Sequence, residues 1–178
     1  MNLNSPRPQR IFFVGGRGAG KTTVGGALAR ALGWSSVDTD ILVEEDAGMS
    51  IARMVETRGW DYFREKEARA LERACRMERV VVSTGGGIVL KPENRERLRG
   101  SGIVVWLNAD ARVLVSRIGS REGWSSRPSL TGASPAEEMA QVLAQREPLY
   151  RETATLILDA ALPVSELVAA ICNHGKDL

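Results

Sequence analysis

Short, nearly continuous apolar runs alternate with helical patterns along most of the chain. Five runs predict buried strands, at residues 11–14, 36–38, 79–83, 103–107 and 155–158. Runs rich in Val and Ile are typical of parallel strands that helices cover on both faces. Between the runs, apolar residues recur at helical spacing, as at Val24, Leu28 and Leu32. The alternation predicts a three-layer, doubly wound α/β fold with about five parallel strands.

Two intervals depart from simple alternation. Residues 40–77 predict a mostly helical insertion, with turn signals at Gly48 and Gly59. Residues 119–134 are rich in Gly, Ser and Pro, and so long a run of loop formers predicts a functional lid. A helix should follow, with Ser134 as its cap and Pro135 at its first position. We expect residues 1–178 to form one domain that carries both segments.

Composition narrows the class of protein. An apolar content of 43% and a charged content of 26% are ordinary for a soluble globular chain. The net charge of +2 indicates no nucleic-acid partner. Cys75, Cys172 and the single histidine, His174, form no metal-binding or disulfide pattern. No apolar run approaches the ~20 residues that span a bilayer. We therefore expect a cytoplasmic monomer without a membrane partner.

Residues 15–22, Gly-Gly-Arg-Gly-Ala-Gly-Lys-Thr, match the phosphate-binding loop pattern G-x-x-x-x-G-K-[ST]. The motif lies between a predicted strand and a predicted helix, which is its proper context. Backbone N–H groups and the helix N-terminus would hold phosphates, Lys21 would reach the β- and γ-phosphates, and the Thr22 hydroxyl would ligate Mg²⁺. A glycine turn before a surface lysine is the alternative, and the flanking elements argue against it. The chain should bind a nucleoside triphosphate.

The second predicted strand ends in Asp38-Thr39-Asp40. Ligands bind at the carboxyl edge of open parallel sheets. Asp38 could hold Mg²⁺ directly or through a water, while Asp40 could orient an acceptor hydroxyl or take its proton. Alone, the two aspartates could equally be a solvated pair that caps the next helix. Their place one strand after a phosphate-binding loop favours the catalytic interpretation.

Gly85–Gly87 directly follow a Val-rich strand. Three consecutive glycines favour close approach of a ligand to the backbone over a flexible turn. Arg64 and Glu67 stand three residues apart on a predicted helix, so the carboxylate can hold the guanidinium. By itself this pair would be an ordinary surface ion pair, and Arg146 an ordinary solvated helix residue.

In their joint order and spacing, these segments resemble the shikimate kinases over nearly the whole chain. The matching residues are 15–25, 37–40, Phe63-Arg64-x-x-Glu67, 83–87, Asn94-Arg95, 127–132 and 146–150. The resemblance implies a nucleoside-monophosphate-kinase-like P-loop fold. It also implies Mg²⁺-dependent transfer of the γ-phosphoryl group of ATP to the 3-hydroxyl of shikimate, on the route to chorismate and the aromatic amino acids.

The resemblance also implies roles for individual residues. Those expected to bind ATP are Gly15, Gly18, Ala19, Gly20, Lys21, Thr22, Thr23, Arg117 and Arg127. Asp40 and the backbone of Gly85–Gly87 would meet the hydroxyls of shikimate. Arg64 and Arg146 would clamp its carboxylate, with Glu67 beside Arg64. Thr22 and Asp38 would serve Mg²⁺, and catalysis would fall to Lys21, Asp40 and Arg127.

Arg127 has an independent argument as well, because a lid arginine can neutralise the charge that spreads over the transferring phosphoryl oxygens. Alternatively it contacts only solvent or adenine. Two features depart from the commonest family pattern. Residues 127–130 read Arg-Pro-Ser-Leu where many members have Arg-Pro-Leu-Leu, and Trp60 stands where glutamate is common. The indole would form a wall of the acceptor pocket or pack between helices.

Other functions agree less well with the sequence. A kinase of another small hydroxy acid, such as gluconate, is disfavoured by Gly85–Gly87 and by the Phe63–Glu67 segment. A non-catalytic module that binds ATP or shikimate would be expected to lack Lys21, Asp38 or Asp40. A GTPase switch needs Asn-Lys-x-Asp and Asp-x-x-Gly segments, which the chain does not contain. A dinucleotide-binding loop would need glycine at the position of Lys21.

Overall fold

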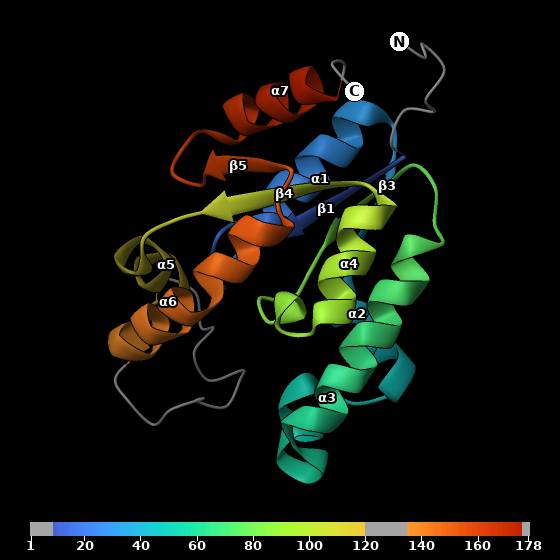
Figure 1. The fold of residues 1–178 in the computed structure, drawn as a ribbon, viewed down its shortest axis with the longest axis vertical. Helices are drawn as coiled ribbons and strands as arrows, with labels where there is room; N and C mark the ends of the chain where they lie inside the picture. The colour runs from blue at the N-terminus through green and yellow to red at the C-terminus, as the bar shows by residue number, and fades with distance from the viewer. Residues whose placement is uncertain (1–8, 120–134, 176–178) are drawn as a thin grey trace.

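The structure, a computed structural model, describes residues 9–119 and 135–175. Five parallel strands form one sheet in the order β2-β3-β1-β4-β5 (Figure 1). The strands are β1 (Arg10–Val14), β2 (Ser35–Asp38), β3 (Val80–Ser83), β4 (Ile103–Asn108) and β5 (Leu156–Asp159). The predicted fold class is confirmed, and each predicted strand is present with its ends shifted by one residue at most.

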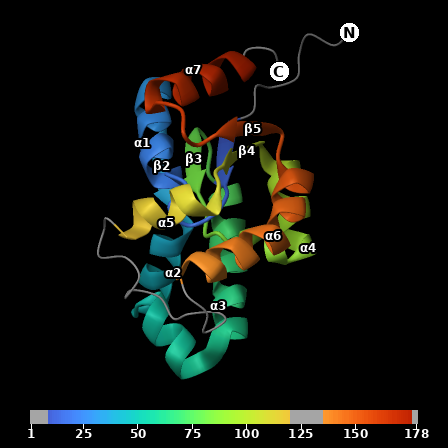
Figure 2. The same ribbon diagram turned by 90° about the vertical axis from the view of Figure 1, so that its left-hand side faces the viewer.

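Helices cover both faces of this sheet (Figures 1 and 2). The helices are α1 (Lys21–Leu32), α2 (Thr39–Ala47), α3 (Ile51–Cys75), α4 (Pro92–Ser101), α5 (Ala111–Gly119), α6 (Pro135–Thr153) and α7 (Val164–His174), with a 3₁₀ turn, η1, at Ile88–Leu90. Side chains of α1, α5 and α7 pack on one face, and those of α3 and α4 pack on the other. Helix α6 contributes to both clusters, with Met139 in the first and Tyr150 in the second. Within the described residues, no helix is long and apolar enough to cross a membrane.

Strict alternation along the central strands divides the core into two layers. Ile11 and Phe13 of β1 pack toward α1 and α7, whereas Phe12 and Val14 pack toward α3 and α4. All four side chains are buried. A slip of one residue would exchange the two faces of the strand, so burial on both sides holds the register of the sheet.

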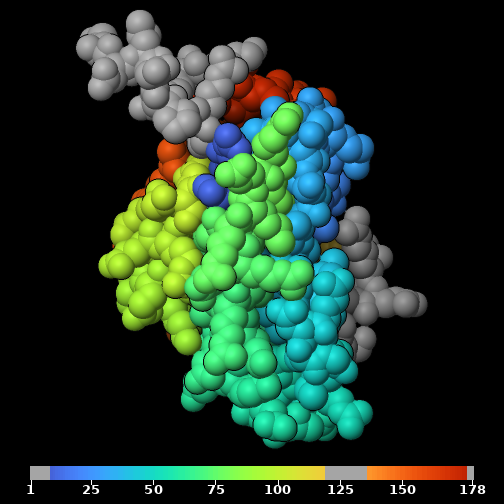
Figure 3. All heavy atoms as spheres, turned by 90° about the vertical axis from the view of Figure 1, so that its right-hand side faces the viewer, coloured from blue at the N-terminus to red at the C-terminus, as the bar shows by residue number. Residues whose placement is uncertain are grey.

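The interval predicted to be a helical insertion contains α2 and α3. The two helices are held together by their own apolar cluster, which includes Leu42, Met54 and Phe63. They form an elongated end of the molecule, opposite α7 (Figures 2 and 3). The C-terminal half of α3 returns along the sheet and adds Leu71 and Ala74 to the core there. Residues at the middle of α3 are thereby brought beside the carboxyl edge of the sheet.

The segment predicted to be a lid lies largely outside the described residues. Gly119 is the last residue of α5, and 120–134, with Arg127 and Ser134, are not described. Helix α6 begins at Pro135, the position predicted for its first residue. Proline suits that position, because the first N–H of a helix has no partner within it.

Helix α3 contains a break at Gly59, where φ is 81° and ψ is 171°. Only glycine adopts this conformation freely. Gly59→Ala is expected to lower the free energy of unfolding by about 1–3 kcal/mol through backbone strain alone. Among the residues that the structure describes, no contact within 4 Å awaits a Cβ placed there, so crowding does not contribute.

Gly100→Ala in α4 is the matched control, because a Cβ at that position also meets nothing within 4 Å and the backbone is helical. It should leave stability unchanged or raise it by about 0.5–1 kcal/mol. Urea denaturation of both variants measures the difference. Equal stabilities of the two variants would contradict the assignment of strain to Gly59.

Candidate active site

The loop between β1 and α1 is folded as an anion cradle. Gly20, the residue before α1, has φ 89° and lies in the left-handed region. Ala19, within the loop, is buried, and its N–H donates to the carbonyl of Gly16 at 3.3 Å. The helix therefore begins at the loop, with its first N–H groups and the positive end of its dipole directed there. Such a helix N-terminus binds phosphate groups.

Lys21 is folded over this loop. Its ammonium donates to the carbonyl oxygens of Gly15 at 2.9 Å and Gly16 at 2.8 Å. The positive charge thus lies at the mouth of the cradle. From there it can reach the phosphates of a nucleotide that the loop holds.

Asp38 makes two hydrogen bonds, one of which confirms the predicted helix cap, while its metal role stays a prediction. One carboxylate oxygen, Oδ1, accepts the N–H of Asp40 at 2.9 Å and caps α2. The other, Oδ2, accepts the hydroxyl proton of Thr22 at 2.9 Å. Capping therefore leaves one oxygen of Asp38 beside Thr22, on the side of the phosphate-binding loop. Oxygens of this kind are the ligands that Mg²⁺ prefers, usually completed by waters and substrate phosphates.

Gly85 and Gly87 lie where neighbouring groups leave no room for a side chain, whereas a Cβ at Gly86 would make only ordinary contacts. A Cβ at Gly85 would stand 2.6 Å from Oε1 of Glu67 and 2.8 Å from Oδ1 of Asp40. A Cβ at Gly87 would collide with the guanidinium of Arg64. The glycines therefore admit side chains of α2 and α3 against the backbone at the end of β3. Close approach of these protein side chains accounts for glycine at positions 85 and 87, while the approach of a ligand to this backbone stays a prediction.

Arg64 and Glu67 form a short ion pair of 2.5 Å. Glu67 is 1% exposed and Arg64 14% exposed, so this is not a solvated surface pair. The guanidinium also lies 5.5 Å from the ring centre of Trp60 and 4.9 Å from that of Phe63. One carboxylate and two aromatic rings thus hold Arg64 in one orientation. Trp60 is part of the wall around this arginine.

Arg146 reaches the same glycine loop from α6. A Cβ at Gly86 would stand 3.6 Å from Nη1 of Arg146 and 3.4 Å from the carbonyl oxygen of Gly15. Gly86 therefore lies between Arg146 and the phosphate-binding loop. Two arginines from different helices, Arg64 and Arg146, approach consecutive glycines. Together they provide guanidinium groups suited to a carboxylate.

A cavity of about 610 Å³ is lined by residues 17–24 of the loop and first turn, Asp38, Asp40 and residues 84–86. The rest of its lining, called here the apolar end, consists of Arg117, Ile118, Ala160, Leu162, Val164 and Leu167. Arg64, Glu67 and Arg146 are not in this lining, although they approach the glycine loop, two residues of which are.

Sequence reasoning missed two groups at the site. Thr39 is fully buried, and its Oγ1 accepts the N–H of Gly85 at 3.2 Å. A threonine between two aspartates at a strand end carries no local signal for that contact, which spans 46 residues. The apolar end of the cavity was also missed, because Ile118 and Leu162 resemble ordinary core or surface residues. Arg117 was expected here, and its guanidinium donates to the carbonyl of Ala160 at 2.8 Å.

Comparison with known proteins identifies the family. The family model for shikimate kinase matches residues 17–174. The chain belongs to the shikimate kinase family. It is 55% identical to a shikimate kinase of Oleidesulfovibrio alaskensis over 157 residues, which is 88% of this chain and 91% of that protein. The resemblance seen in the sequence is confirmed.

Solved structures agree with this family. A shikimate kinase of Acinetobacter baumannii, solved in complex with shikimate, is 34% identical with a TM-score of 0.86, over 93% of this chain and 91% of that one. A gluconokinase of Sinorhizobium meliloti shares the fold at 24% identity and a TM-score of 0.64, over 97% of each chain. The shared fold does not distinguish acceptors.

The buried ion pair yields a stability prediction. Glu67→Gln should lower the free energy of unfolding by about 1–3 kcal/mol, because the partly buried Arg64 guanidinium loses its counter-charge. Glu72→Gln is the control: Glu72 pairs with Arg76 at 2.6 Å on the same helix, but the two side chains are 45% and 76% exposed. That change should cost less than about 0.5 kcal/mol. Equal losses in urea denaturation would refute the special status of the Arg64–Glu67 pair.

Proposed function

We propose that this chain transfers the γ-phosphoryl group of ATP to the 3-hydroxyl of shikimate, giving shikimate 3-phosphate and ADP on the route to chorismate. One observation carries the proposal beyond the family assignment. Asp40, Gly85 and Gly86 line the same cavity as the phosphate-binding loop. Arg64 and Arg146 approach the neighbouring backbone at Gly87 and Gly86. A hydroxylated carboxylate fits between these acceptors and cations.

The donor half of the site would hold ATP. The phosphates would lie in the cradle of residues 15–22, with Lys21 moving from the Gly15 and Gly16 carbonyls to the β- and γ-phosphate oxygens. The apolar end of the cavity, bounded by Ile118 and Leu162, would take the adenine ring beside Arg117. Thr23 lines the cavity as well.

Mg²⁺ is the expected metal, and the residues present fit it. Thr22 Oγ1 and Asp38 Oδ2 are hard oxygen donors side by side at the loop, 2.9 Å apart. Two protein ligands are enough, because Mg²⁺ keeps waters and takes substrate phosphate oxygens. When bound there, the ion would neutralise charge on the β- and γ-phosphates.

In the acceptor half, Arg64 and Arg146 would bind the carboxylate of shikimate, and Glu67 would keep Arg64 in place. Asp40 and the Gly85–Gly87 backbone would meet its hydroxyls. Asp40 would orient the 3-hydroxyl toward the γ-phosphorus or accept its proton as the new P–O bond forms. The bond between the γ-phosphorus and the bridging oxygen of ADP breaks in line with this attack.

The organisation of the chain is part of the proposal. One kinase domain would comprise the loop at 15–22, an acceptor-binding helical segment at about 40–77 and a lid at about 119–134. The lid would close over the nucleotide, exclude water and bring Arg127 to the phosphates or adenine. We further propose that the enzyme works as a monomer in the cytoplasm, without nucleic-acid or membrane partners.

An ADP-release assay with purified chain, ATP and Mg²⁺ tests the acceptor. Shikimate should support turnover at least about 10³-fold above gluconate in kcat/KM, because gluconate cannot place its carboxylate and hydroxyls on the same rigid ring geometry. The assay without acceptor measures basal ATP hydrolysis. Comparable rates with gluconate would favour the other hydroxy-acid kinase, and no acceptor-dependent rate would favour a binding module.

The role of Asp40 predicts a separation of binding from turnover. Asp40→Asn should lower kcat by roughly 10²–10⁴-fold, while the Kd for ATP changes less than about threefold, because the carboxylate faces the acceptor. Asp46→Asn is the control, since Asp46 of α2 forms an exposed ion pair with Arg73 of α3. Coupled kinetics and ATP titration measure both quantities. Near-normal turnover in the Asp40 variant would remove this residue from the mechanism.

A further inference from the structure

Side chains hold the carbonyl groups of the glycine loop and the turn that follows it. The Gly86 carbonyl accepts the hydroxyl proton of Tyr150, with 2.5 Å between the oxygens. The Ile88 carbonyl accepts Nδ2–H of the buried Asn94 at 3.0 Å. Side chains from outside residues 86–90 thus donate hydrogen bonds to carbonyl groups along this segment. These contacts hold the peptides from Gly86 onward, whereas the N–H of Gly85 is held by Thr39.

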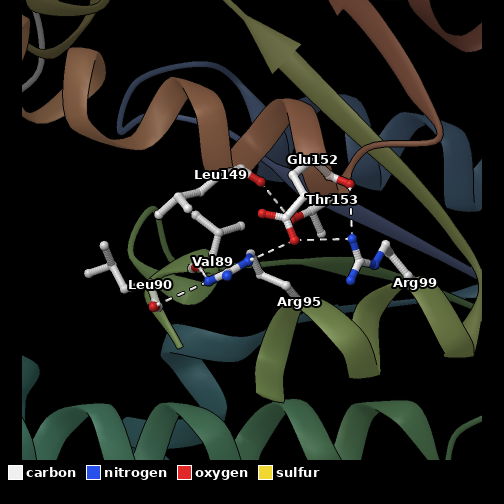
Figure 4. Close-up of polar contacts among 7 residues, drawn as sticks. All are labelled: Val89, Leu90, Arg95, Arg99, Leu149, Glu152 and Thr153. Atoms are coloured by element: carbon white, nitrogen blue, oxygen red, sulfur yellow. Dashed lines mark hydrogen bonds and ion pairs between the residues drawn. The ribbon is translucent and has the colours of Figure 1, made fainter. Parts of the chain in front are cut away.

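Arg95 fastens the far end of the same segment. Its Nη1 donates to the carbonyls of Val89 at 2.9 Å and Leu90 at 3.4 Å. Figure 4 shows the guanidinium directed at both carbonyls from α4, with Glu152 of α6 on its other side. Arg99 binds the same carboxylate at 3.1 Å, and in the described structure it donates to no carbonyl of residues 86–90. Arg95 therefore connects α6 to the segment, whereas Arg99 connects α6 only to α4.

Tyr150 is built into the core as a fixed donor. It is fully buried, and its ring stacks on Trp106 at a centroid distance of 5.8 Å. Burial raises the pKa of its phenol above the ordinary value, although the hydrogen-bonded Arg146 guanidinium opposes the shift. The phenol therefore stays protonated at neutral pH and can donate to the Gly86 carbonyl. Its oxygen in turn contacts Arg146, one helical turn earlier on α6.

These contacts connect Arg146 to Arg64 through Tyr150 and the glycine loop. Arg146 meets the Tyr150 phenol, the phenol donates to Gly86, and Gly87 lies against Arg64. The spacing between the two arginines is thus set through the glycine loop and one hydroxyl group. A rigid ligand that bridges both arginines and the loop is sensitive to such spacing, because small misplacements cost large factors in binding and rate.

We propose that Tyr150 and Arg95 are positioning residues of the acceptor half of the site. Tyr150 holds Gly86 and Arg146 in register, and Arg95 holds the following turn against α6. The inference rests on the proposed function, because shikimate is the ligand whose binding would report the positions. Neither residue needs to touch the reacting atoms.

Tyr150→Phe tests the proposal with minimal change of shape. The Kd for shikimate, measured by titration calorimetry without nucleotide, should rise about tenfold, because the partly buried Gly86 carbonyl loses its donor and Arg146 loses its hydrogen bond to the phenol. The Kd for ATP should stay within about twofold, since the phosphate-binding loop keeps its own contacts.

Thr153→Val is the matched control for Tyr150→Phe. Thr153 is also a buried hydroxyl residue of α6, and it donates to a main-chain carbonyl, that of Leu149 at 2.6 Å (Figure 4). This contact stays within the helix. The control should leave the shikimate Kd unchanged at a comparable loss of stability. Equal effects of the two variants on shikimate binding, or equal weakening of ATP and shikimate by Tyr150→Phe, would overturn the proposal for Tyr150.

Arg95→Met and Arg99→Met form a second matched pair that does not depend on the buried core. Arg95→Met should raise the shikimate Kd about fivefold, and Arg99→Met should leave it unchanged. Of the two arginines, only Arg95 donates to the carbonyls of residues 86–90 among the described contacts. Equal effects would overturn the proposal for Arg95. Failure of the proposed function is a different result: the wild-type chain would then neither bind shikimate nor release ADP in its presence.

Discussion

The absence of side chains at Gly85–Gly87 allows the parts of the site to meet. Groups from three helices and from the phosphate-binding loop converge on this stretch of backbone, and a Cβ atom at Gly85 or Gly87 would clash with them. Asp40 and Glu67 approach Gly85, Arg64 lies against Gly87, and Arg146 faces Gly86. A methyl group at Gly85 or Gly87 would push an acceptor-side group outward. The steric requirement for glycine at positions 85 and 87 is thus the condition on which the meeting of these side chains depends.

The parallel sheet brings this stretch beside the phosphate-binding loop. Strand β3 lies between β2 and β1, with Ser83 in register with both Asp38 and Phe13. Because parallel strands end at the same edge, the loop after β1, the aspartates after β2 and the glycines after β3 are neighbours. Helix α3 then places Arg64 from one side, while α6 places Arg146 from the other. Donor and acceptor groups come together without any long irregular segment among the described residues.

Local sequence patterns predicted the strands and the phosphate-binding loop. Contacts between residues far apart in the sequence could not be predicted in this way. Apolar runs located the five strands, and the glycine pattern located residues 15–22, because both signals are local. Asp38 caps α2, one of the two interpretations that the sequence allowed, and its other oxygen lies beside Thr22, while its metal role stays a prediction. The contact between Tyr150 and Gly86 spans 64 residues, and no periodicity encodes such a distance. Arg146 looked like a solvated helix residue for the same reason.

The central claim is that one cavity presents a phosphate donor to a hydroxyl held by Asp40, with the carboxylate of the acceptor on Arg64 and Arg146. A crystal structure of the chain with shikimate and ADP tests it most directly. We expect the carboxylate of shikimate within hydrogen-bond distance of both guanidinium groups, and the 3-hydroxyl beside Asp40 and directed at the nucleotide. A shikimate bound with its carboxylate away from both arginines, or with the 3-hydroxyl remote from Asp40, would contradict the claim.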